Sequence, residues 1–551
     1  MKVVILNGCN LTMQEVWDVA YNYAEVRIAK EAYASVEKAH SFLQNEVNLG
    51  KTIYGVNTGF GQLASVRIEN PMDAVEMQRR LVISHAVGVG KTLEIPTIRA
   101  IVLIRLNTQL AGHSGVAKTT IRLLQQFLNK RIHPVIPEQG SVGASGDLCP
   151  LSHIACALIG VGEVLVEFAH LNNGEPTLMS AKDALNHFQL LPLELGYKEG
   201  LALINGTSYM AALGAIACIK AKNVLQTAEI CTAIATEALC GRLEAFDARI
   251  HQVRRHKGQI KTAENLLELL KNSQFAGIQS DTLAKLTPQS ETPETLDWCK
   301  TAVLEKFIKQ KNIPQDAYSI RCSPQVLGAS RAALKHVRQI IDAELNAVVD
   351  NPLIFVGVNG NGSILSGGNF HGQPIALALD YLKLSIAEIG NLIERQVNKL
   401  LDPATNDSLP PFLAAMPGMN SGLMIAQYTA ASLVSENKVL VHPASADSIP
   451  TSANQEDHVS MGPIAGRQAL EIIHNVEKVL AIHLLTSTQA LDMRRLQLVQ
   501  WGIPNPQNAP KIAKITKKVR SLVPYLHEDR YLHPDINTII QALPDIYELG
   551  E

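Results

Sequence analysis

Hydrophobic positions recur every three or four residues along most of this chain. The longest run has these members: Ile375, Leu379, Leu382, Ile386, Ile389, Ile393, Val397 and Leu400. A similar run precedes it: Leu334, Val337, Ile341, Leu345 and Val348. Such spacings predict long helices that bury one apolar stripe, and strand-like alternation is nearly absent. The pattern therefore predicts a mainly all-α fold, a large elongated helical bundle.

The N-terminal part shows shorter helical patterns. Thr12 is placed to cap a helix that reaches Ala20, and the helical pattern continues to about Glu46. A break follows at Tyr54–Gly61, where three glycines rule out a regular helix, so we expect a loop. The helical pattern then resumes over residues 77–84, 96–110 and 116–128.

We expect one intertwined helical domain over residues 1–551, because no internal repeat or low-complexity tract divides the chain. Its N-terminal part, about 1–200, holds the glycine-rich loop. The central bundle covers about 201–503, and about 504–551 forms a C-terminal helical cap. A polar stretch near 279–312, broken by Pro288 and Pro293, is predicted to be a surface excursion.

Composition narrows the class of partner. Of 551 residues, 46% are hydrophobic and 18% are charged, which suffices for a large core, and the net charge is -2. This charge gives no argument for nucleic acid or a membrane surface, so the expected partner is a small molecule. The eight cysteines include no Cys-x-x-Cys pair, which argues against a zinc site and a disulfide framework.

Two apolar stretches could suggest a membrane or secretion signal, and neither fits. The run at residues 3–6 is too short for a signal peptide. The uncharged stretch 201–219 is interrupted by polar residues and followed by Lys220 and Lys222, which favours a buried helix over a membrane span. We therefore expect a cytoplasmic protein with neither a membrane partner nor a metal.

The segment Ala144-Ser145-Gly146 can react with itself. In a tight bend the amide nitrogen of Gly146 can attack the carbonyl carbon of Ala144, and a side chain on Gly146 would block that approach. Loss of two waters, one involving the Ser145 hydroxyl, leaves a 4-methylidene-imidazol-5-one, an electrophile that no ordinary side chain supplies.

Taken alone, Ala-Ser-Gly is usually an ordinary loop. A serine-hydrolase elbow is excluded, since the final glycine and a βαβ pattern are missing.

The longer string carries the specific signal. Residues 140–148 read Gly-Ser-Val-Gly-Ala-Ser-Gly-Asp-Leu, and Pro-Leu-Ser-His follows at 150–153. This string closely resembles the cofactor segment of the aromatic amino acid ammonia-lyase and aminomutase family. The resemblance implies the family's helical fold and a prosthetic group formed from Ala144, Ser145 and Gly146, with no diffusible cofactor. It also implies a homotetramer whose active sites combine several subunits, so the apolar stripes would include subunit contacts.

Two further strings match the family. Tyr54 heads the glycine-rich loop; a loop tyrosine often only packs over the core, but a phenol in a dry pocket can also act as a base. The string 54–61 resembles the loop with the family's catalytic base, which implies that role for Tyr54.

Asn205 is an amide in an apolar run and needs hydrogen bonds if buried. The resemblance implies that it positions the prosthetic group or stabilises charge on its ring oxygen.

Residues for the substrate's carboxylate follow later in the chain. Arg321 lies three residues after Tyr318, and a guanidinium suits a bidentate grip on a carboxylate, although a surface ion pair is its commoner role. The string 318–325 resembles the family's carboxylate-binding segment, with Tyr318 close to the reaction. The string 367–372 also matches, which implies that Phe370 forms a wall of the pocket. The matches extend from Tyr54 to His458, nearly the whole chain.

Two positions bear on the substrate's side chain. His85 could hydrogen-bond a polar ring; phenylalanine-specific relatives usually have an apolar residue there, but some tyrosine-specific ones also have histidine. Glu456 discriminates better, because the run 452–461 resembles that of histidine-specific members, whereas relatives acting on phenylalanine or tyrosine generally have glutamine. A carboxylate can accept a proton from an imidazole N–H. An exposed acidic loop is the structural alternative.

These observations predict a carbon–nitrogen lyase that eliminates ammonia from L-histidine to give trans-urocanate. Two departures bear on substrate range: the stretch 279–312 is longer than in compact bacterial histidine-specific relatives, and Cys149 replaces the usual alanine. Tyrosine or phenylalanine ammonia-lyase and 2,3-aminomutase remain alternatives, because the same electrophile and base serve all of them. A non-catalytic helical scaffold is the rival from another class, and it predicts an uncyclised Ala-Ser-Gly peptide.

Overall fold

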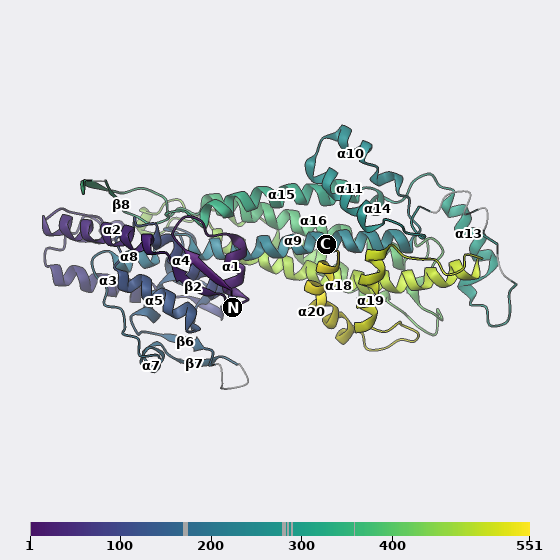
Figure 1. The fold of residues 1–551 in the computed structure, drawn as a ribbon, viewed down its shortest axis with the longest axis horizontal. Coiled ribbons are helices and arrows are strands. Elements are labelled where there is room, and N and C mark those ends of the chain that lie inside the picture. Colours follow the sequence, from purple (N-terminus) through teal and green to yellow (C-terminus); the bar gives the residue numbers. More distant parts are fainter. Residues whose placement is uncertain are drawn as a thin grey trace. The chain divides into compact units, whose positions relative to one another are not determined.

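Helices dominate the structure, a computed structural model (Figure 1). It describes residues 2–168, 175–277, 283, 286–287, 290–357 and 359–550. The mainly all-α prediction is confirmed. Within these residues, no helix combines the length and the apolar composition that a membrane crossing requires. The uncharged stretch at 201–219 is divided, because the helical path breaks at Asn205 between α8 and α9.

The chain forms two compact units, each made of three segments. Unit 1 comprises Met1–Ile219, Val337–Asp380 and Pro443–Arg467. Unit 2 comprises Lys220–His336, Tyr381–His442 and Gln468–Glu551. Four of the five boundaries fall within long helices: α9 (Ser208–Ala238), α15 (Ser323–Glu344), α16 (Gln373–Leu401) and α18 (Gly462–Gln500). The fifth boundary, between His442 and Pro443, lies outside the helices. The single intertwined domain stays a prediction.

Unit 1 contains the N-terminal helices. They are α1 (Met13–Ala20), α2 (Lys30–Asn48), α3 (Pro71–His85), α4 (Ile95–Leu110), α5 (Lys118–Asn129), α6 (Leu148–Leu158), α7 (Ala181–His187) and α8 (Glu199–Ile204). The predicted cap of α1 is confirmed: the Thr12 hydroxyl accepts the Glu15 N–H at 3.2 Å, and the Glu15 carboxylate accepts the Thr12 N–H at 2.9 Å. The helix α3 begins earlier than predicted, because Asn70 caps it and Pro71 occupies its first turn.

All named strands belong to unit 1 and form four small sheets. The parallel pair is β1 (Val3–Leu6) with β2 (Glu25–Ile28), in register from Val3 opposite Glu25. The other strands pair antiparallel in three sheets. The first sheet pairs β3 (Val89–Thr92) with β5 (Pro137–Gln139), and the last pairs β8 (Leu353–Val356) with β9 (Gly362–Leu365). In the three-stranded sheet, β6 (Glu163–Val166) lies between β4 (Ile132–Pro134) and β7 (Thr177–Ser180). Strands this short carry too few residues to show alternation in the sequence.

The helices wholly within unit 2 complete the fold. They are α10 (Ala248–Arg254), α11 (Lys257–Leu269), α13 (Thr301–Lys311), α14 (Tyr318–Arg321), α17 (Met424–Leu440), α19 (Pro510–Leu522) and α20 (His533–Gly550). Short 3-10 turns also occur: η1 (Gly61–Leu63), η3 (Glu244–Phe246), η4 (Asp297–Cys299), η5 (Pro411–Leu413), η6 (Ala444–Ala446) and η7 (Ser452–Asn454).

The apolar stripes behave as the periodicity predicts. All eight members of the α16 stripe are buried. In the preceding run Leu334, Val337, Ile341 and Leu345 are buried, but α15 ends at Glu344, so both Leu345 and Val348 lie beyond the helix. Part of the predicted excursion, at 279–282, 284–285 and 288–289, lies outside the described residues. Its described remainder includes η4 and α13, which bury Trp298, Leu304 and Phe307.

Candidate active site

The turn at Ala144-Ser145-Gly146 is sharply bent and clamped by backbone. Gly146 has φ +76°, and a Cβ there would lie 2.2 Å from the carbonyl oxygen of Gly206, so only glycine fits. Gly206 donates its N–H to the Ser145 carbonyl at 3.2 Å, and its own carbonyl accepts the Asp147 N–H at 2.7 Å. The segment that follows α8 therefore holds one side of the turn.

A third segment holds the turn from its N-terminal side. The Met461 N–H donates to the Val142 carbonyl at 2.9 Å, and the Ser460 hydroxyl donates to the Gly143 carbonyl at 3.2 Å. The Ser141 hydroxyl also donates to the Gly146 carbonyl at 3.3 Å. Segments far apart in sequence thus fix the bend that an attack within the backbone requires.

Asp147 anchors the end of this turn. Its side chain is fully buried, and Oδ2 accepts the N–H groups of Tyr209 at 2.8 Å and Met210 at 3.0 Å, in the first turn of α9. Its Oδ1 has no hydrogen-bond partner among the described residues. Burial raises the pKa of Asp147 to about 7, although the two N–H donors act in the opposite direction.

Asn205 lies on the other side of the reactive turn. Its Nδ2 donates to the Ser145 carbonyl at 3.5 Å, and its buried Oδ1 has no partner in the described part of the chain. The Asn205 backbone carbonyl accepts a 2.8 Å hydrogen bond from Nη2 of Arg105 on α4. Burial lowers the pKa of Arg105 to about 10. A buried cation thus supports the segment that clamps Ser145.

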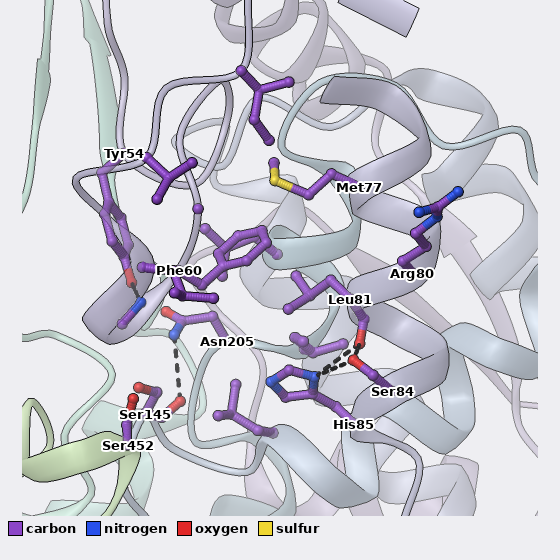
Figure 2. A pocket seen from close by; sticks show the side chains of 18 of the residues that line it. Tyr54, Phe60, Met77, Arg80, Leu81, Ser84, His85, Ser145, Asn205 and Ser452 are labelled. Atoms are coloured by element: carbon purple, nitrogen blue, oxygen red, sulfur yellow. Dashed lines mark hydrogen bonds between the residues drawn. The ribbon is translucent and has the colours of Figure 1, made fainter. Parts of the chain in front are cut away.

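A cavity of about 840 Å³ opens beside Ser145 (Figure 2). Its lining comes from the glycine-rich loop, α3, the end of α8 and the segment around Glu456. The lining includes these polar residues: Tyr54, Asp73, Glu76, Arg80, Ser84, His85, Ser145, Asn205, Ser452 and Glu456. Figure 2 shows the Tyr54, His85 and Asn205 side chains around this space. The structure therefore brings together five residues predicted for the site: Tyr54, His85, Ser145, Asn205 and Glu456.

The glycine-rich loop holds Tyr54 through side-chain contacts with the backbone. Asn57 accepts the Ile53 N–H through Oδ1 at 2.7 Å. Gln78 of α3 donates to the Gly55 carbonyl at 2.9 Å and accepts the Leu201 N–H at 3.1 Å, so it ties the loop to both α3 and α8. The Tyr54 hydroxyl accepts the Gly61 N–H at 3.1 Å, which fixes the direction of the phenol oxygen.

His85 and Glu456 face Ser145. His85 is the last residue of α3, and its Nδ1 lies 2.8 Å from the Leu81 carbonyl. Burial lowers the pKa of His85, opposed by that carbonyl and by the charge of Glu456. Glu456 accepts the Ser145 hydroxyl at Oε1 at 2.9 Å and the Thr451 hydroxyl at Oε2 at 2.8 Å. Glu456 is thus a half-buried residue of the site and not an exposed acidic loop.

Tyr318 and Arg321 belong to unit 2. Arg321 lines a separate cavity of about 390 Å³, its Nε donates to the Asp316 carbonyl at 3.1 Å, and its guanidinium lies 4.7 Å from the centre of the Tyr318 ring. The Tyr318 side chain is 72% exposed. Phe370 is half-buried in unit 1 and does not line the cavity beside Ser145. The roles assigned to Tyr318, Arg321 and Phe370 remain predictions.

Comparison with known proteins decides the family. The model of the aromatic amino acid lyase family matches residues 11–521. The chain belongs to this family. It is 44% identical over 537 residues to a histidine ammonia-lyase of Geobacillus thermodenitrificans, covering 98% of this chain and 96% of the relative. It is 43% identical over 541 residues to that of Bacillus subtilis, again covering 98% and 96%.

Solved structures of other family members share the fold. A histidine ammonia-lyase from Trypanosoma cruzi aligns with a TM-score of 0.84 at 37% identity, covering 100% of this chain and 95% of that one. A tyrosine aminomutase from Streptomyces globisporus aligns with a TM-score of 0.85 at 38% identity, covering 99% and 97%. The family membership and the ammonia-lyase fold predicted from the sequence are confirmed.

Several residues of this lyase site were not predicted from the sequence. Met77 and Arg80 line the cavity from α3, on the same helical face as Ser84, and their spacing of three and four residues could have singled them out. Phe60 also lines the cavity and stands within the matched glycine-rich string. Arg105 has no such signal, because α4 is buried on all sides and its sequence does not distinguish one face.

Proposed function

We propose that this chain is a histidine ammonia-lyase, which eliminates ammonia from L-histidine to give trans-urocanate. The observation that carries the proposal is the hydrogen bond from Ser145 to Glu456 in a cavity shared with Tyr54 and His85. A carboxylate and an imidazole at this place suit a substrate ring that carries N–H groups, whereas a bare phenyl ring offers neither of them a hydrogen bond. The likeness to curated histidine ammonia-lyases supports the same substrate.

The residues around Ser145 fit the predicted prosthetic group. The bend at Gly146 has no room for a Cβ, and the Asn205 amide reaches the Ser145 carbonyl while its own Oδ1 is buried without a partner. Ala144, Ser145 and Gly146 would hold a 4-methylidene-imidazol-5-one. Such a group would supply an electrophilic carbon, which activates an amine as a leaving group. The scheme uses no metal and no diffusible cofactor.

Tyr54 is the base in this scheme. Its phenol lines the cavity, and the Gly61 N–H directs the oxygen. It removes the proton from the substrate β-carbon as the amine leaves from the α-carbon, which forms the double bond of the product. Asn205 orients the Ser145 carbonyl through its amide nitrogen.

The remaining groups hold the substrate. Glu456 and His85 orient the imidazole ring, Arg321 binds the carboxylate with Tyr318 nearby, and Phe370 forms a wall. Arg321, Tyr318 and Phe370 come to the site with the homotetramer that we propose, in which several subunits complete each active site. The geometry of Arg321 supports this role, because its guanidinium keeps donors beyond its bond to the Asp316 carbonyl.

A substrate assay tests the proposal. The purified protein is incubated separately with histidine, tyrosine and phenylalanine, and the conjugated acid and ammonia are both quantified. Turnover of histidine alone is expected, and Ser145→Ala should abolish it while circular dichroism stays unchanged. Near-normal activity of Ser145→Ala would overturn the proposal that Ser145 forms the electrophile. A preference for tyrosine would overturn histidine as the substrate.

A tyrosine 2,3-aminomutase is the second candidate, because the Streptomyces globisporus enzyme is as similar in structure as the histidine ammonia-lyase. A phenol hydroxyl could also donate to Glu456. A mutase would return a β-amino acid and little free ammonia, so chromatography of the tyrosine reaction separates the two functions.

A further inference from the structure

The position of the hydrogen on the His85 ring follows from its neighbours. The Leu81 carbonyl can only accept, and it lies 2.8 Å from Nδ1, so Nδ1 carries the hydrogen. The Ser84 hydroxyl donates to the same carbonyl at 3.0 Å, which leaves its oxygen as a further acceptor 3.1 Å from Nδ1. Because burial lowers the pKa of His85, the ring is neutral near pH 7 and Nε2 carries a lone pair.

This lone pair is available to a ligand. Figure 2 shows Nδ1 bonded to the end of α3 and the other ring nitrogen turned toward the interior of the cavity. Within the described residues no hydrogen bond reaches Nε2. His85 therefore offers the cavity an acceptor and no donor.

Glu456 offers a second acceptor. Its Oε2 is held by the Thr451 hydroxyl, and its Oε1 accepts the Ser145 hydroxyl. The dehydration of Ser145 that the proposed function requires removes that hydroxyl. The carboxylate then keeps its orientation through Thr451, while Oε1 becomes free to accept from a ligand.

We propose that the site binds histidine with its ring in the imidazolium form, with one N–H directed to Glu456 and the other to Nε2 of His85. This inference rests on the proposed function and specifies the charge state of its substrate. A neutral imidazole has a single N–H, so its lone pair would face one of the two acceptors. A phenol has one O–H and a phenyl ring has none, so neither satisfies both residues.

Glu456 is the charge that acts on the ring. The other two carboxylates of the lining, Asp73 and Glu76, lie on α3 twelve and nine residues before His85, and Glu76 Oε1 is paired with Arg80 Nε at 3.1 Å. Tyr54 is the remaining titratable group beside His85 in that lining, and Arg321, which the proposed function brings to the site, is matched by the substrate carboxylate. The negative charge of Glu456 therefore stabilises a positive ring.

A charged ring also helps the chemistry. An imidazolium withdraws electron density from the adjacent β-carbon more strongly than a neutral imidazole does. The β-proton is then easier for Tyr54 to remove. Recognition of the charged ring thus assists the step that Tyr54 performs.

Calorimetric titration with two unreactive ligands tests the inference. The dissociation constants of 3-(imidazol-4-yl)propanoate and 3-phenylpropanoate are measured with the dehydrated protein between about pH 6 and pH 9. The phenyl compound has no titrating ring, so dividing the dissociation constant of the imidazole compound by that of the phenyl compound isolates the effect of ring protonation. We expect this ratio to rise about tenfold per pH unit above the ring pKa of the free imidazole compound, with uptake of one proton when that compound binds.

The Glu456→Gln variant is the matched control. Its amide can donate to a neutral ring, so the ratio should become independent of pH. A flat ratio in the wild-type protein would overturn the inference, and a slope that persists in Glu456→Gln would overturn the assignment of an N–H to Glu456. Ammonia release from histidine is measured on the same samples: active protein with a flat ratio rejects only the charged ring, whereas no release rejects the proposed function.

Discussion

The Ser145 hydroxyl donates a 2.9 Å hydrogen bond to Oε1 of Glu456, 311 residues further along the chain. The contact joins the side chain predicted to become an electrophile to the side chain predicted to select the substrate. Thr451 holds the other oxygen of the same carboxylate. The Glu456 carboxylate therefore lies beside the reacting atoms of Ser145, where its charge has most effect on the substrate.

Replacing Glu456 by glutamine should reduce selectivity for histidine. The variant loses a hydrogen bond to a charged group, so kcat/KM for histidine relative to tyrosine should fall about tenfold to a hundredfold. The two specificity constants are measured side by side, and intact mass serves as the control, since both proteins should have lost two waters. Equal losses on both substrates would show that Glu456 does not select between them.

Replacing Gly146 by alanine should prevent the loss of two waters. A Cβ at Gly146 would meet the Gly206 carbonyl at 2.2 Å, so the bend cannot form. Gly162 is the matched control, because it has a similar φ of +83° with nothing within 4 Å of the added Cβ. Intact mass and circular dichroism are compared for both alanine variants. Dehydrated Gly146→Ala protein would contradict the assignment, and Gly162→Ala should be dehydrated.

Much of the site could be predicted because its residues lie within distinctive strings. Tyr54, Ser145, Asn205 and Glu456 come from four separate segments, and the structure places all four around one cavity. The α16 stripe could be predicted for a different reason: eight apolar residues at helical spacing have few other ways to be buried.

Other features depend on tertiary contacts that leave no local signal. Arg105 is a charged residue within a helix buried on all sides, and its bond to the Asn205 carbonyl exists only once α4 and α8 are packed. The raised pKa of Asp147 likewise depends on its burial against α9. Neither property can be read from neighbours in the sequence.

Replacing Tyr54 by phenylalanine should remove the base and leave the rest of the site intact. The phenol makes one hydrogen bond within the described protein, with the Gly61 N–H, so the loop should keep its fold. We expect kcat for histidine to fall by roughly 10²- to 10⁴-fold, the usual contribution of a general base. Binding of 3-phenylpropanoate and the dehydrated mass should both stay unchanged. A Tyr54→Phe protein that retains its waters would instead assign Tyr54 to formation of the prosthetic group.

Asp147 should make the stability of the fold depend on pH. Its pKa is about 7 in the folded protein against an ordinary value of 3.8. Between these values the folded chain holds a proton that the unfolded chain has lost, so the free energy of unfolding falls as pH rises, by roughly 4 kcal/mol in all. The stabilisation is complete below about pH 4 and is lost as pH passes 7.

The Asp147→Asn variant lacks this titration. The melting temperature of the wild-type protein should therefore fall relative to that of the variant as pH rises from about 4 to 7, measured by differential scanning calorimetry. Asp247 provides the control, because its bond with Arg249 lowers its pKa to about 2. Asp247→Asn should follow the wild-type curve across this range and diverge from it only at lower pH. Parallel curves for wild type and Asp147→Asn would mean that Asp147 stays ionised in the folded protein despite its burial.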